Sequence, residues 1–165
     1  MVREHLRPVT PEYLDAAPVR LVAAARLAAP PEALFRALTE DCSTWPLWFP
    51  EVTRAGYTGP PPYGPGAGRA VRLRGGAHFV ESVLLWERPH RFVYRVEQVN
   101  FPGAHAWLEE WRLDPAGPGT DARYTLAFDV SRPLEWAARA LRPVVVRSLR
   151  RALHGLDAFA ARGEG

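Results

Sequence analysis

The sequence predicts an α+β domain in which a curved antiparallel sheet of six to seven strands packs against one long C-terminal helix. Residues 132–161 carry apolar side chains at intervals of three and four, the period of a helix with one buried face. Residues 71–130 instead alternate apolar and polar side chains, the period of half-buried strands. Short turn sequences separate the alternating segments, which favours consecutive hairpins.

The beginning of the chain predicts an extended arm. Residues 1–19 contain Pro8, Pro11 and Pro18 and have no sustained period, so we expect at most one helical turn there. We therefore expect an N-terminal arm over residues 1–19 and a single ligand-binding domain over residues 20–162.

The domain begins with a strand and two short helices. Residues 20–27 alternate and predict the strand. Pro30 and Pro31 end it and open a helix in PPEALFRALTE, since proline is tolerated in a first helical turn. The aromatic stretch CSTWPLWFPEV follows, and its two prolines limit it to short helical turns.

The middle of the chain predicts a meander. GPPPYGPGAGR (residues 59–69) is rich in Pro and Gly, which indicates a surface loop between two strands. Gly75-Gly76 marks a hairpin turn. The strands expected after the loop cover residues 71–74, 77–87, 91–97, 107–113 and 123–130.

The C-terminal helix is expected to bury one stripe and expose an arginine face. Pro143 removes an intrahelical hydrogen bond, so it predicts a break or bend near that residue. The arginine face is Arg139, Arg142, Arg147, Arg150 and Arg151. The stripe expected to be buried is Leu134, Ala138, Leu141, Val145, Leu149, Ala152, Leu156 and Phe159.

Composition excludes several classes of function. All 21 basic residues are arginine, which excludes lysine Schiff-base chemistry and lysine-dependent phosphate loops. The net charge is +3, but acids and arginines are interspersed along the chain. We therefore expect no nucleic-acid binding.

Cysteine and histidine usage indicates no metal site. Cys42 is the only cysteine and the five histidines are scattered, so neither a disulfide within the chain nor a metal-ligand spacing is present. We expect no metal and no cofactor. No apolar run approaches about 20 residues, and residues 1–15 lack the apolar core of a signal peptide, so we expect a cytoplasmic protein.

Four segments carry a resemblance to a known superfamily. They are APPEALFRALTEDCSTWPLWFPEV, FVESVLLWERPHRFVYRV, AWLEEWRLDP and GPGTDARYTLAFDV, followed by the closing helix. With them the chain resembles the START/Bet v-like helix-grip superfamily (SRPBCC), especially its bacterial polyketide cyclase/dehydrase or lipid-transport branch. The resemblance implies a sheet and a long helix that enclose a deep cavity for apolar or amphipathic molecules, with the helical pair at its mouth.

Two glutamates are the candidate catalytic residues. Strand parity turns Glu81 inward if Phe79, Val83 and Leu85 face inward, and Trp107 and Trp111 define the face of Glu109 in the same way. A carboxylate in an apolar cavity has a raised pKa, which suits acid–base chemistry or the binding of a polar ligand group.

Alternatives remain open for both acids. The opposite face of residues 77–87 is equally apolar, a bulge would reverse either parity, and an inward glutamate could pair with Arg72, Arg74 or Arg95. The aromatic residues could likewise form plain core. The full candidate ligand-binding set is Trp45, Trp48, Phe49, Phe79, Glu81, Val83, Tyr94, Trp107, Glu109, Trp111, Tyr124, Leu141 and Val145.

The favoured function is binding or transport of a hydrophobic small molecule, either lipid-like or similar to an aromatic polyketide. One alternative is a cofactor-independent cyclase/dehydrase or aromatase-type enzyme that uses a pocket carboxylate. A second is a protein-interaction module similar to the helix-grip activators of heat-shock ATPases. We expect a monomer or homodimer, and the arginine face suits either plain solvation or transient contact with an acidic membrane.

Overall fold

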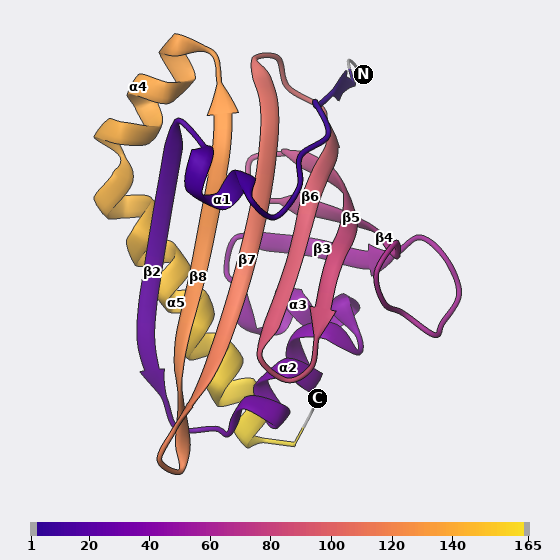
Figure 1. The fold of residues 1–165 in the computed structure, drawn as a ribbon, viewed down its shortest axis with the longest axis vertical. Helices are drawn as coiled ribbons and strands as arrows, with labels where there is room; N and C mark the ends of the chain where they lie inside the picture. Colours follow the sequence, from indigo (N-terminus) through magenta and orange to yellow (C-terminus); the bar gives the residue numbers. More distant parts are fainter. Residues whose placement is uncertain (1–2, 164–165) are drawn as a thin grey trace.

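The computed structural model describes residues 3–163, which form a curled antiparallel sheet and a C-terminal helical segment (Figure 1). The hydrogen-bonded strand order is β2-β8-β7-β6-β5-β4-β3, and the short β1 pairs with β6. The strands are β1 (Glu4–His5), β2 (Val19–Leu27), β3 (Val52–Tyr57), β4 (Gly68–Leu73), β5 (His78–Glu87), β6 (Arg91–Val99), β7 (Ala104–Ala116) and β8 (Gly119–Val130).

The helices lie where the proline and periodicity signals predict them. They are α1 (Tyr13–Ala16), α2 (Pro31–Thr39), a 3-10 turn (Cys42–Thr44), α3 (Trp45–Trp48), α4 (Arg132–Ala140) and α5 (Arg142–Ala161). The predicted α+β fold with two short helices after its first long strand is confirmed. The C-terminal segment breaks at Leu141, which places Pro143 in the first turn of α5, where its missing N–H needs no partner.

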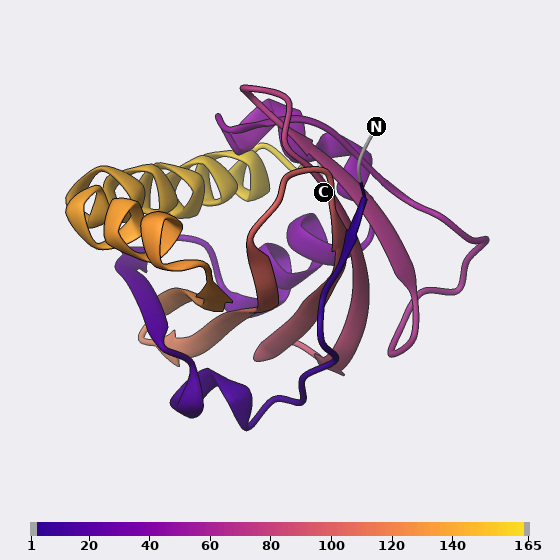
Figure 2. The same ribbon diagram turned by 90° about the horizontal axis from the view of Figure 1, so that it is seen from above.

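The helix α5 covers the concave face of the sheet (Figure 2). Its residues Leu149, Leu153, Leu156 and Phe159 are buried in the main core. A Cβ on Gly155 would overlap the carbonyl oxygen of Trp48, so α5 and the end of α3 meet backbone to backbone. This contact holds α3 over the end of the sheet.

Two residues of the predicted buried stripe are instead exposed. Leu134 and Leu141 are 37% and 53% exposed, and α4 has no buried residue. The break at Leu141 changes the course of the helical segment, so α4 packs on the main core through the partly buried Ala138 while Leu134 and Leu141 are left exposed. Helical periodicity alone did not show which part of the apolar stripe packs on the core.

The N-terminal arm packs on the convex face of the sheet. Leu6 joins the main core, whereas Val9 and Leu14 form a second apolar cluster with residues of β6, β7 and β8. The N–H of Leu6 donates to Glu97 and that of Arg7 donates to His105. The arm therefore bridges β6 and β7 where these strands diverge.

Two local irregularities change which side chains face inward. The β5–β6 register shifts between Val83 and Leu85, so Leu85 packs in the outer cluster while Trp86 packs against the main core. The predicted loop over residues 59–69 ends earlier than expected, because β4 begins at Gly68. The second residue of β4, Arg69, is fully buried.

Candidate functional site

A cavity of about 370 Å³ lies between the concave face of the sheet and the first turns of α5. Its mouth is at Glu51 and Val144, which are both exposed. The Ser148 hydroxyl of α5 donates to the Glu51 carboxylate at 3.1 Å across this mouth. The lining comprises Trp45, Phe49, Glu51, Val52, Val71, Leu73, Phe79, Glu81, Tyr94, Trp107, Glu109, Tyr124, Leu126, Val144, Val145, Ser148 and Leu149.

Most of the candidate residues lie in this lining, and four do not. Trp48, Val83 and Trp111 are buried outside it. The Trp111 ring stacks on Tyr124 with centroids 3.9 Å apart, so it supports the cavity wall from behind. Trp48 contacts Trp111 edge to face. Leu141 lies at the exposed break between α4 and α5.

The candidate set omitted several lining residues. Val71 and Leu73 follow the alternation of their strand, Leu126 shares the inward parity of Tyr124, and Leu149 lies on the apolar stripe of the helix. Those patterns were visible in the sequence. Glu51 and Ser148 carry no comparable signal, because each is a polar residue whose place at the mouth depends on how α5 crosses the sheet.

Glu109 is buried at the polar end of the cavity and accepts three hydrogen bonds. Its Oε2 accepts from the Tyr94 hydroxyl at 2.6 Å and from the Tyr124 hydroxyl at 2.5 Å. Its Oε1 accepts from the Trp107 indole at 2.9 Å. These donors come from β6, β8 and β7, so adjacent strands position the carboxylate.

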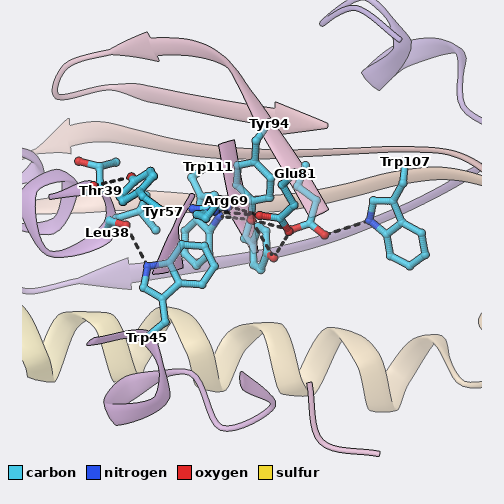
Figure 3. A network of polar contacts seen from close by, with 11 residues as sticks. Leu38, Thr39, Trp45, Tyr57, Arg69, Glu81, Tyr94, Trp107 and Trp111 are labelled. Carbon is cyan, nitrogen blue, oxygen red and sulfur yellow. Dashed lines mark hydrogen bonds and ion pairs between the residues drawn. The ribbon is translucent and has the colours of Figure 1, made fainter. Parts of the chain in front are cut away.

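Glu81 is held by a buried arginine rather than by neutral donors. The Nε and Nη2 atoms of Arg69 donate to Glu81 Oε2 at 2.8 and 2.6 Å. The guanidinium carbon lies 4.2 Å from the Trp45 ring centroid and 4.1 Å from that of Tyr94. Figure 3 shows Arg69 among these rings. Arg72, Arg74 and Arg95, the partners weighed from the sequence, do not contact either acid in the described residues.

Burial raises the pKa of both carboxyl groups. The pKa of Glu81 rises to about 7, since burial and the nearby Glu109 outweigh the opposing effect of Arg69. The pKa of Glu109 is also raised by burial, although its three donors and Arg69 act in the opposite direction. Burial and the adjacent carboxylate raise the pKa of Tyr94 and Tyr124 well above 10, so both phenols remain neutral donors.

The site combines an apolar chamber with an interior acid, Glu109, that forms no ion pair within the described residues. Glu109 lines the cavity and can accept a further hydrogen bond through Oε1. Within residues 3–163, no group of three His, Cys, Asp or Glu side chains is arranged to hold a metal ion. None of the helices in that range is long and apolar enough to cross a membrane.

Related sequences and structures agree with this architecture. An uncharacterized protein of Mycobacterium tuberculosis is 31% identical over 147 residues, which cover 89% of this chain and 87% of the relative. A START superfamily protein from Mycobacterium smegmatis superimposes with a TM-score of 0.70 at 16% identity, covering 82% of this chain and 94% of the other. For the ZhuI aromatase/cyclase of Streptomyces sp. R1128 the TM-score is 0.70 at 19% identity, covering 87% and 94%.

The two solved structures, at 16% and 19% identity, show that this chain shares their fold. Residues 18–161 match the family described as polyketide cyclase/dehydrase and lipid transport, which covers most of the chain. Together with the curled sheet, the long helix and the internal cavity, this match shows that the chain belongs to the family described as polyketide cyclase/dehydrase and lipid transport.

Proposed function

We propose that the protein binds a hydrophobic, ring-containing or lipid-like small molecule in the cavity and carries it without a cofactor. The observation that supports this most directly is an unfilled, mainly apolar chamber that ends in Glu109. Aromatic rings line its inner part, and Val144 and Val145 line its mouth. Such a chamber accepts the apolar body of a ligand while one polar group fixes its orientation.

The alternative is a cyclase/dehydrase or aromatase-type enzyme with Glu109 as its acid–base group. The raised pKa of Glu109 and its place in the cavity favour this reading. Glu81 is less suited to proton transfer, because it is bound to Arg69. If the protein is an enzyme, Glu109→Gln abolishes turnover of a bound polyketide-like substrate while binding persists.

The protein-interaction alternative receives less support from the structure. A module that acts only through its surface has no need of an internal chamber of this size, and a filled core would serve it better. We therefore place binding of a small molecule ahead of protein interaction.

Delivery of the ligand would bring the cavity mouth to a membrane surface. The α4 helix buries none of its residues, and Trp136 and Val144 are 76% and 64% exposed. The exposed Arg142 and Arg147 follow directly along the same helical segment. Apolar side chains beside arginines suit a bilayer that contains anionic lipid.

Dye binding tests the proposed function. The neutral dye N-phenyl-1-naphthylamine should fluoresce when added to the folded protein, and aromatic polycycles should displace it. Val145→Trp should abolish this signal because the new ring fills the cavity, whereas Arg147→Trp adds the same ring at an exposed position outside the lining. Dye binding that appears only as the protein unfolds would contradict cavity binding. Native mass spectrometry of the purified protein would identify a retained ligand.

A further inference from the structure

The charges that line the cavity have the opposite sign to the net charge of the chain. The chain carries 21 arginines and a net charge of +3. The described lining nevertheless contains three acids, Glu51, Glu81 and Glu109, and no arginine or histidine. A ligand that enters this cavity therefore meets acidic groups from the mouth to the inner end.

The two inner acids differ in how their charge is compensated. Arg69 binds Glu81 directly through two nitrogens. Glu109 receives only neutral donors, from Tyr94, Tyr124 and Trp107, and no ion pair in residues 3–163 includes it. Because Oε1 accepts a single hydrogen bond, it can still accept one from a ligand.

The protein already holds one cation in the same aromatic surroundings. The Arg69 guanidinium lies between the rings of Trp45 and Tyr94, about 4 Å from each centroid, a range in which ring faces attract cations. Both rings also line the cavity, together with Phe79, Trp107 and Tyr124. A second cation beside Glu109 would thus have a carboxylate and several aromatic rings around it, as Arg69 has.

We infer that the ligand is a cationic amphiphile, with a ring-containing or hydrocarbon body in the apolar chamber and a protonated amine at Glu109. This inference rests on the proposed binding function and specifies its ligand class. An ammonium group would donate to Glu109 Oε1 and lie against the ring of Trp107, which donates to the same oxygen. A carboxylate ligand would meet like charges at Glu51 and Glu109, since Arg69 compensates the charge of Glu81.

Three probes with one ring system separate the headgroups. They are 1-naphthylmethylamine, 1-naphthalenemethanol and 1-naphthoic acid, with binding measured by calorimetry at pH 7.5. We expect the amine to bind about 10-fold more tightly than the alcohol, because an ion-paired hydrogen bond is roughly twice as strong as a neutral one. The acid should bind most weakly of the three.

Two adjacent glutamates provide a matched pair of variants. Glu109→Gln should lower the affinity for the amine about 10-fold and change the affinity for the alcohol by less than about 2-fold. Glu110→Gln removes the same charge from the opposite face of β7, where Glu110 pairs with Arg91 and Arg112 outside the cavity. The affinity for the amine should stay unchanged in that control.

The outcomes distinguish this inference from the proposed function. Alcohol binding as tight as amine binding in the wild-type protein overturns the cationic ligand but retains the cavity. The inference is also overturned if Glu109→Gln lowers the affinities for the amine and the alcohol equally. The same holds if Glu110→Gln lowers the affinity for the amine as much as Glu109→Gln does. If none of the three probes binds and the dye is excluded as well, the proposed function itself fails.

Discussion

Gly155 of α5 lies directly against the carbonyl group of Trp48 at the end of α3. No side chain separates the two backbones at this point. Since Trp48 packs on Trp45 and Phe49, and both of those rings line the cavity, this contact sets the position of one cavity wall.

Replacing Gly155 by alanine should destabilise the protein by about 2 kcal/mol, because the new methyl group overlaps backbone atoms that cannot rotate away. Helix propensity alone would give the opposite sign, a gain of about 1 kcal/mol. Urea unfolding measures the difference. The exposed Ala158→Gly on the same helix reports the propensity effect by itself, and a stabilised Gly155→Ala would show that α3 and α5 do not touch.

Glu81→Gln and Glu109→Gln should affect stability very differently. The first leaves the buried Arg69 guanidinium without its charged partner and should lower the free energy of unfolding by roughly 3 kcal/mol or more. The second removes a carboxyl group that has no cationic partner in the described chain, so we expect a loss under about 1 kcal/mol. Thermal melting of the two variants side by side makes this comparison, and equal losses would contradict it.

Removing both members of the ion pair should restore much of that stability. The double variant Arg69→Met/Glu81→Leu fills the same space with apolar side chains and leaves no charge unpaired. Replacements of this kind are often neutral or stabilising. The double variant should therefore melt above Glu81→Gln, and a double variant less stable than Glu81→Gln would show that the aromatic contacts of Arg69 dominate.

Stability should fall as the pH rises through the range in which the interior acids ionise. Burial raises the pKa of Glu109 above its ordinary value of 4.5, so the folded state binds its proton more tightly than the unfolded state. The stabilising effect of protonation is complete below pH 4.5 and is lost as the pH rises through the raised pKa of Glu109, with a slope of at most about 1.4 kcal/mol per pH unit for one proton.

The contribution of Glu109 can be isolated by subtraction. Its pKa is raised in the folded protein, so Glu109→Gln should become progressively more stable relative to the wild type as the pH rises above 4.5. Urea unfolding at several pH values between 4.5 and 8 gives this difference. A difference that is independent of pH would show that Glu109 titrates normally.

If the protein contacts membranes, its binding to vesicles should depend both on the charge of the lipid and on the arginine face. Vesicles that contain phosphatidylserine should bind the protein, and Arg142→Gln/Arg147→Gln should weaken binding by about 30-fold, since each of the two basic residues contributes roughly 1 kcal/mol. Arg20→Gln/Arg123→Gln removes the same charge from exposed positions on the sheet and should have little effect. Equal losses in the two double variants would contradict a specific docking face.

Much of the site could be predicted because strand parity is a local property. Glu109 points inward because Trp107 and Trp111 fix the face of its strand, and both acids proved to be buried. Strand parity gave the wrong face for Leu85, because a bulge shifts the β5–β6 register and turns this side chain to the outer cluster. It also could not separate the lining from the layer behind it, so Trp48 and Trp111 were grouped with the residues that line the cavity.

Arg69 was missed because two local rules pointed the wrong way. It ends a segment rich in proline and glycine, which is typical of a surface loop, and arginine is seldom fully buried. Its burial depends on Glu81 twelve residues later and on the rings of Trp45 and Tyr94. Only the folded arrangement brings these partners together. The prediction that Leu141 lines the cavity was wrong for a similar reason. The path of α4 is set by the break at Leu141 and not by its apolar residues.

The ion pair between Arg69 and Glu81 also has a consequence for how β4 and β5 align. The two residues are direct cross-strand partners in this hairpin. Sliding β4 by one residue would turn Arg69 to the outer face and put Ala70 in its place, leaving Glu81 buried without its cation. A proline- and glycine-rich loop precedes this hairpin and the Gly75-Gly76 turn closes it, so the ion pair reinforces the alignment that the turn sets. The buried charges therefore help to fix the strand register.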